Sequence, residues 1–184
     1  MKQLLMLMSA AVMGLWSCSE KGVSKKLSET DSLIAFAQGE IAELQRAQKT
    51  LRKTVSRGEE VTTETLANVD WSNELEWVTA WSLQGAKKKC VYDETIDSSG
   101  ALKIVRYNAQ DSTAALQELM VNYRKNEIQL MQWTVRQRSW YLDRDLRISF
   151  QPKQGYGVWV NENAIWTSPN AYEIFAEIQN AVAQ

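Results

Sequence analysis

The feature that most constrains this chain is a change in the spacing of its apolar residues near Gly85. Beyond that glycine, apolar and polar residues alternate with a period of two, which is typical of half-buried β-strands. Turn-forming segments such as 97–100 and 125–126 separate the runs and leave no room for crossover helices. The pattern predicts an antiparallel meander of about six or seven strands. The clearest runs are 87–96, 101–109, 116–124, 127–138, 140–151 and 155–161.

The last segment, 171–182, fits two kinds of secondary structure. Its apolar residues can lie along a strand through Tyr172, Ile174 and Phe175, or on one side of a terminal helix that ends near Val182. Periodicity alone leaves both interpretations open.

Before Gly85 the apolar spacing alternates between three and four residues, which is typical of an amphipathic helix. We expect a first helix of about eight turns, with a capping-box-like start at 28–31 and an apolar stripe over 34–55. Its apolar stripe suits packing on this protein's own sheet or second helix, and pairing with another chain as a coiled coil is the alternative. The stripe consists of Ile34, Ala37, Ile41, Leu44, Leu51 and Val55, interrupted by Gln48.

A second helical region is expected from about Thr62, after the break at 57–60. Asp70 or Ser72 can cap its second piece. Three tryptophans at helical spacing are more often core than a sugar or lipid platform, so we expect them in the core. This piece carries Trp71, Leu75, Trp77, Val78 and Trp81.

Together these patterns predict an α+β fold in which N-terminal helices pack on a C-terminal antiparallel sheet. We expect one domain over 28–184 with a single core. Its helical part would cover 28–85 and its sheet 86–184.

The first 17 residues have the form of a secretory signal peptide, with Lys2 before an apolar run that is too short to span a bilayer. The run ends in Leu15-Trp16-Ser17-Cys18, the pattern of a bacterial lipobox. We expect lipidation at Cys18, which would anchor the chain to a membrane, followed by a flexible tether over 18–27. A plain secreted protein is the alternative.

The segment Asp70-Trp71-Ser72-Asn73-Glu74-Leu75-Glu76, together with the lipobox and the order of helices before strands, resembles a group of small lipoproteins of the Bacteroidota type. That resemblance implies an outer-membrane location and leaves open which leaflet carries the anchor. It implies no catalytic or binding residue.

Composition excludes several classes of function. The chain has no histidine, which removes Ser-His-Asp and Cys-His catalysis and His-ligated zinc. Its 21 basic and 22 acidic residues give a net charge of -1, so a nucleic-acid partner is not expected. Asp143 and Asp145 alone fall short of a calcium loop, and Cys90 is expected to be buried and inert. We expect no enzyme activity, cofactor or metal.

Alternation also assigns the two faces of the sheet. The face opposite the core gathers aromatic and arginine side chains, which are enriched in protein interfaces. A polar face held by cross-strand ion pairs is the alternative. The partner-binding candidates are Tyr141, Trp159, Arg136, Arg138 and Arg147. The residues expected to face the core are Leu119, Val121, Tyr123, Met131, Trp133, Val135, Trp140, Leu142, Leu146, Ile148 and Phe150.

The sequence thus predicts a lipid-anchored, non-enzymatic interaction protein, an accessory subunit of a cell-envelope complex. The partner would bind the first helix or the arginine-aromatic face. The alternative is a lipid- or glycan-binding module with an apolar pocket between sheet and helices, lined by the tryptophans. A hydrolase that uses carboxylates is a third class. A hollow beneath the helices would favour the module, and a filled interior with an exposed patch would favour the interaction protein.

Overall fold

The computed structural model describes residues 23–81 and 91–180, with the side chains of the first helix described from Ser32 on. Within these ranges the chain forms three helices and one sheet of nine strands. The helices are α1 (Val23–Arg46), α2 (Trp71–Glu74) and α3 (Glu76–Ala80). The strands are β1 (Thr50–Arg57), β2 (Glu60–Leu66), β3 (Tyr92–Ser99), β4 (Leu102–Ala109), β5 (Leu116–Arg124), β6 (Glu127–Arg138), β7 (Leu142–Gln151), β8 (Gly155–Ala164) and β9 (Asn170–Gln179).

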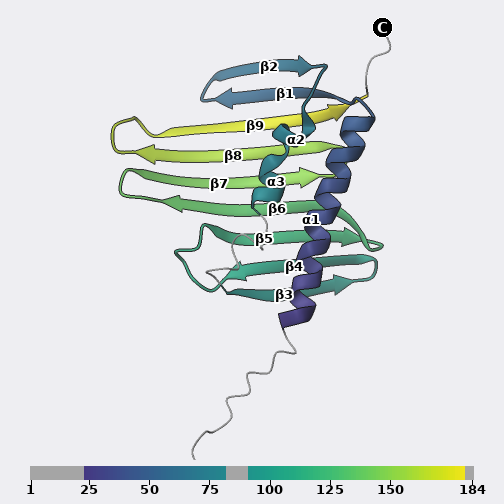
Figure 1. The fold of residues 1–184 in the computed structure, drawn as a ribbon. Helices are drawn as coiled ribbons and strands as arrows, with labels where there is room; N and C mark the ends of the chain where they lie inside the picture. The colour runs from purple at the N-terminus through teal and green to yellow at the C-terminus, as the bar shows by residue number, and fades with distance from the viewer. Residues whose placement is uncertain (1–22, 82–90, 181–184) are drawn as a thin grey trace, which may run out of the picture.

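Every strand pairs antiparallel with its neighbours, in the order β2-β1-β9-β8-β7-β6-β5-β4-β3 (Figure 1). Strands β3 to β9 follow one another as a meander, so the predicted antiparallel sheet is confirmed. The sheet is larger than expected, because the β1–β2 hairpin extends it beyond β9. Segments from the two ends of the described chain therefore lie side by side.

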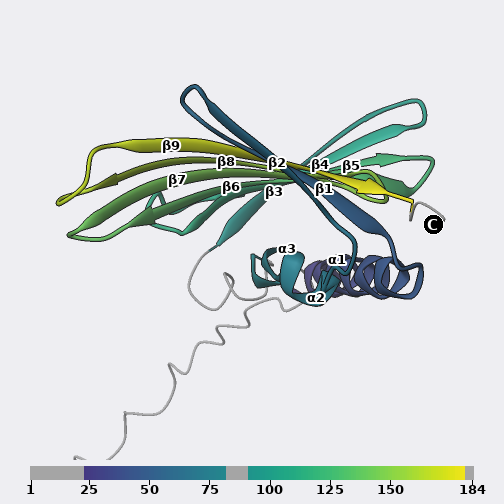
Figure 2. The same ribbon diagram turned by 90° about the horizontal axis from the view of Figure 1, so that it is seen from above.

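The helices lie on one face of the twisted sheet, and the described chain places no element on the other face (Figure 2). Helix α1 runs across the strands, and α2 and α3 lie beside it (Figure 1). Its buried residues Leu33, Ala37 and Leu44 face the sheet. Packing on this protein's own sheet is thus the observed arrangement of α1.

The expected helix over 34–55 is wrong beyond Arg46, and the helical region expected from Thr62 is a strand as far as Leu66. The helix ends where Gln48 takes a positive φ of 47°. Leu51 and Val55, four residues apart, share a face in a helix and also in a strand, so their spacing does not distinguish the two. Two threonines in β1 and three in β2 favour the extended backbone. Helix α1 also begins earlier than expected, at Val23.

The ambiguous C-terminal segment is a strand, β9, as far as Gln179. Its central residues pair with both β1 and β8. Ala176 is completely buried in the core, while Phe175 points to the opposite face and is 60% exposed.

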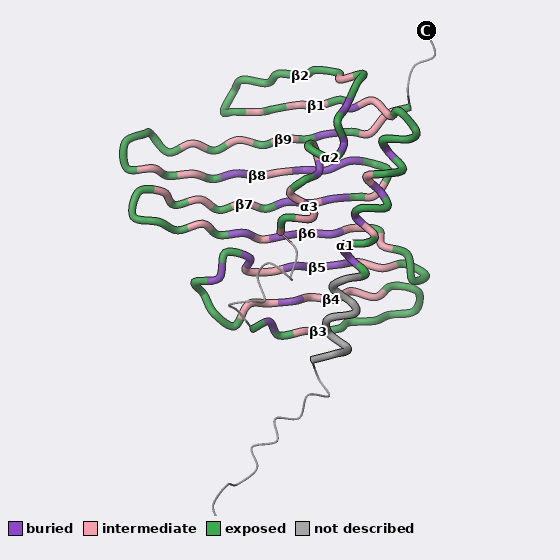
Figure 3. Tube along the Cα trace, in the orientation of Figure 1, coloured by how far each residue is buried: buried purple, intermediate pink, exposed green. Residues whose placement is uncertain are grey.

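Most residues expected in the core are buried there, as Figure 3 shows for the purple segments of β5 to β8. Trp133, Val121 and Phe150 are almost completely enclosed. The expectation for Trp140 is wrong, because it is 74% exposed. The hairpin turn takes up residues 139–141, so β7 starts two residues later than predicted and Trp140 is not part of the pleat.

The tryptophans of α2 and α3 belong to the core, as expected. Asp70 caps α2 by accepting hydrogen bonds from the backbone N–H groups of Ser72 and Asn73. Trp71 is buried, and Trp77 meets the rings of the core strands edge to face. The signal peptide, Cys18, Gly85 and Cys90 lie outside the described residues.

Candidate functional site

The side of the sheet that faces away from the helices, here called the open face, carries a row of three side chains across its central strands. Trp159 on β8 lies opposite Arg147 on β7 and opposite Glu173 on β9. Because cross-strand partners share a face, all three side chains project from the open face. Trp159 is 38% exposed, and both charged residues are exposed.

A glycine determines how the indole of Trp159 lies. A Cβ atom at Gly157, two residues earlier on the same face, would lie 2.8 Å from Cη2 of Trp159 and 3.1 Å from Oγ of Ser149. The ring therefore lies along its own strand, in space that any other residue at position 157 would fill. This places an aromatic surface directly on the sheet.

The two charges beside the indole are not neutralised by close ion pairs. Among the described residues, no carboxylate lies within 4 Å of Arg147 and no cationic nitrogen within 4 Å of Glu173. An unpaired cation and an unpaired anion thus flank one aromatic ring. Such groups are available for charge-assisted hydrogen bonds with a partner.

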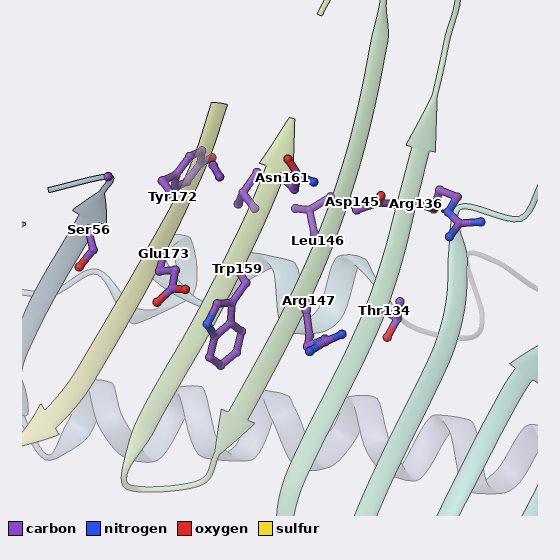
Figure 4. A pocket seen from close by; sticks show the side chains of 13 residues that line it. Ser56, Thr134, Arg136, Asp145, Leu146, Arg147, Trp159, Asn161, Tyr172 and Glu173 are labelled. Atoms are coloured by element: carbon purple, nitrogen blue, oxygen red, sulfur yellow. Dashed lines mark hydrogen bonds and ion pairs between the residues drawn. The ribbon is translucent and has the colours of Figure 1, made fainter. Parts of the chain in front are cut away.

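These residues line a hollow of about 680 Å³ on the open face, shown in Figure 4. Strands β1, β6, β7, β8 and β9 contribute to its walls. Arg136, Arg147 and Trp159, all candidates from the sequence, lie together here. The other labelled lining residues are Ser56, Thr134, Asp145, Leu146, Asn161, Tyr172 and Glu173.

Arg136 and Arg138 are held by carboxylates across the β6–β7 pair. Nε of Arg136 lies 3.3 Å from Asp145, and Nη2 of Arg138 lies 3.1 Å from the same carboxylate. Arg138 also pairs with Asp143. This end of the face matches the alternative interpretation of cross-strand ion pairs, which contribute about 0.2–1 kcal/mol each.

Tyr141 lies apart from Trp159, in the turn between β6 and β7. It lines a second hollow with Arg136 and Arg138. Its ring contacts Trp140 in the same turn, with 5.3 Å between the ring centroids. The five candidates therefore divide between two neighbouring places, and only Arg136 belongs to both.

The residues of β1 and β9 that line the hollow were not predicted from the sequence. Ser56 and Glu173 pair across those two strands, and Glu173 is next to Trp159. Both were overlooked because position 56 followed an expected helix and 171–182 had no firm assignment. The alternation of Tyr172 with Ile174 was the one signal that could have found Glu173 between them.

Around Trp77, aromatic rings occupy the space between the helices and the sheet. Trp77 lies 5.6 Å from Trp133, 6.5 Å from Phe150 and 5.4 Å from Tyr156, measured between ring centroids. The edge-to-face angles are those that aromatic pairs prefer. Of the tryptophans expected to line a pocket in a lipid- or glycan-binding module, Trp77 and Trp133 contact each other, and Trp71 borders a separate hollow of about 1120 Å³ with mostly polar residues of α1, β1 and β2.

One polar cluster lies beside these rings, where β1, α2 and β8 meet. Lys53 lies 2.7 Å from Oε1 of Glu74, and the hydroxyl of Tyr156 donates to the same oxygen. Burial and the hydrogen bond to Glu74 raise the pKa of Tyr156. The hydroxyl therefore stays protonated and serves as a donor that fastens α2 to the sheet.

Two further findings describe the molecule as a whole. In the described part of the chain, no group of three or more His, Cys, Asp or Glu residues is arranged to hold a metal ion. No helix among the described residues is long and apolar enough to cross a membrane.

The fold and site define a class of protein by its architecture: an open nine-stranded antiparallel sheet, covered by helices on one face and carrying an aromatic-arginine hollow on the other. Comparison of the chain with protein-family models and with curated proteins found no match.

Proposed function

We propose that this chain is a lipid-anchored, non-enzymatic interaction protein, an accessory subunit of a cell-envelope protein complex whose partner binds the open face. The observation that carries the proposal is the row of Arg147, Trp159 and Glu173 on an uncovered sheet face. Trp159 and Arg147 are of the residue types that are enriched at the centres of protein interfaces. The anchor at Cys18 belongs to the same proposal and rests on the lipobox pattern, and the outer-membrane location rests on the resemblance to lipoproteins of the Bacteroidota type.

The packing around Trp77 supports this function over the lipid- or glycan-binding module. Trp77 is in edge-to-face contact with three other rings, so the protein's own side chains occupy the space beside this tryptophan. The hollow on the open face is bordered by charged side chains and suits a polar protein surface with complementary charges.

The test is co-purification from native membranes in mild detergent, with proteins and bound small molecules identified by mass spectrometry. We expect a stoichiometric protein partner with the full chain, and at least a tenfold loss of it with Trp159→Ala/Arg147→Ala. Ile96→Ala is the control, because it removes an exposed apolar side chain from the edge strand β3, away from the hollow. A chain that carries only lipid or glycan, with no protein partner, would contradict the proposal.

A further inference from the structure

Four apolar side chains are exposed together at one end of the sheet. Trp140 and Tyr141 lie in the turn between β6 and β7, and Ile165 and Trp166 lie in the turn between β8 and β9. Both tryptophans are 74% exposed. We call these four residues the aromatic tip. The two turns lie at the same end of the sheet and extend beyond the helices (Figures 1 and 2).

The aromatic tip is one unit although it comes from two hairpins. The ring of Trp140 lies 5.3 Å from Tyr141 and 5.6 Å from Trp166, both edge to face. The backbone N–H of Ile165 donates to the carbonyl of Tyr141 at 3.1 Å. The three rings thus form one cluster, and the backbone hydrogen bond places exposed Ile165 next to it.

The tip is uncharged, and its turns satisfy backbone groups internally. Neither 139–142 nor 164–170 contains a charged residue. Each turn is closed by a backbone hydrogen bond, Ser139 N–H to the Leu142 carbonyl at 2.8 Å and Thr167 N–H to the Ala164 carbonyl at 3.1 Å. Internal pairing of this kind lowers the cost of moving backbone out of water.

Charged residues begin immediately behind the tip, and they are paired. Arg138 pairs with Asp143, and Arg144 pairs with Glu162. An uncharged layer of Trp and Tyr in front of a charged layer is the order of residues found at the interface between a bilayer and water. Because these charges neutralise each other, the layer has no preference for anionic headgroups.

The size of the tip favours a lipid surface over a protein. At the exposure of its four side chains, the tip offers on the order of 500 Å². A stable protein interface uses about 800 Å² on each partner, so the tip alone falls short of one. A bilayer sets no such minimum, and a chain anchored nearby would meet it at high effective concentration.

We propose that the aromatic tip inserts into the interfacial region of a lipid bilayer and fixes how the sheet stands on the membrane. This contact is separate from partner binding at the open face. It is driven by burial of aromatic surface and is independent of the headgroup charge.

The test uses the full chain reconstituted into phosphatidylcholine vesicles with or without bromine-labelled acyl chains, which quench nearby tryptophans. Trp140→Phe/Trp166→Phe keeps the tip apolar and removes its reporters, and Trp159→Phe is the matched control on the open face. We expect bromolipid quenching to fall by more than half in the double variant and to stay unchanged in the control. All three chains should melt within a few degrees of one another.

Quenching that is equal in the wild type and the double variant would place both rings away from the acyl chains and overturn the proposal. Light scattering in detergent gives a second check: a dimer that dissociates in Trp140→Ser/Trp166→Ser would assign the tip to a contact between copies and also overturn it. The vesicles contain no other protein, so the result is independent of whether the open face has a protein partner.

Discussion

At the scale of single residues, two positions on β8 require glycine for different reasons. A Cβ atom at Gly155 would lie 1.9 Å from the backbone carbonyl oxygen of Ala176, and Gly155 has a φ of 148°. At Gly157 the nearest atom is the far end of the Trp159 ring. The first glycine allows β8 and β9 to approach, and the second makes room for the indole of the site.

Gly155→Ala should therefore cost about 3 kcal/mol or more, because the backbone itself must move. Gly157→Ala should cost less than about 1 kcal/mol, because a side chain can shift instead. Urea denaturation of both variants measures the difference. The displaced indole in Gly157→Ala should weaken partner binding nearly as much as Trp159→Ala does, and full binding by a folded Gly157→Ala would contradict the role given to the ring.

Glu40 on α1 is the one charged residue buried in the described part of the chain, and its Oε2 has no hydrogen-bond partner. Burial raises the pKa of its carboxyl, with Lys153 opposing the shift and Glu43 adding to it. The folded state thus holds this proton at a pH where the unfolded state has lost it. Stability falls as pH rises from the usual pKa through the raised one.

Glu40→Gln should remove this dependence. Its stability relative to the wild type should increase as pH rises from 4 to 8, and the relative gain should be absent at the acid end, where both side chains are neutral. Urea midpoints across that range are the measurement. Glu59→Gln, in the exposed turn between β1 and β2, is the control. A difference that is constant with pH would contradict the buried, unpartnered carboxyl.

At the scale of elements, α3 contacts the aromatic rings of the core strands through Trp77. Trp77 contacts three aromatic side chains, and its indole N–H donates to the Glu74 carbonyl at 3.0 Å. Trp77→Ala should lower the free energy of unfolding by about 3–5 kcal/mol. Trp166→Ala, at an exposed position, should change it by less than about 0.5 kcal/mol. If denaturant unfolding showed that Trp77→Ala lowers the free energy of unfolding as little as Trp166→Ala does, the surroundings of Trp77 would be less well packed than its ring contacts indicate.

The accuracy of the sequence predictions differed between elements for physical reasons. Strands β5 and β6 were predicted with their observed ends, because several alternating residues and a turn at 125–126 define each of them. The hairpin of β1 and β2 was missed, because residues spaced by four share a face in both kinds of structure. Trp140 was misplaced because alternation continues through a turn in the sequence but not in space.

The residues of the site were predicted or missed for the same physical reasons. Trp159 and Arg147 lie on strands that alternation defines well, so their common face was predictable. Glu173 depends on 171–182 being a strand, which periodicity left open. Ser56 depends on the pairing of β1 with β9, which are distant in the sequence, so it leaves no local signal. Tyr141 was assigned to the open face by the same alternation of polar and apolar residues that wrongly assigned Trp140 to the core.

At the scale of the whole molecule, the sheet is asymmetric, because the helices lie on one of its faces (Figure 2). The opposite face carries the hollow lined by Arg147, Trp159 and Glu173. The edge strands of the sheet are β2 and β3, and both carry acidic residues. These residues are Glu60 and Glu64 on β2, and Asp93, Glu94 and Asp97 on β3. Like charges disfavour pairing between the edges of two copies. The open face is therefore a larger surface for recognition by another protein than the two edge strands are.

The most direct test of that claim is photo-cross-linking in living cells, with a benzophenone amino acid placed at one position at a time. Thr134 on the open face and exposed Gln38 on α1 are the two informative positions. We predict a discrete protein adduct from Thr134 and none from Gln38, and loss of the adduct in the Trp159→Ala background. An adduct from Gln38 together with none from Thr134 would contradict the account, because it would assign recognition to the helical face.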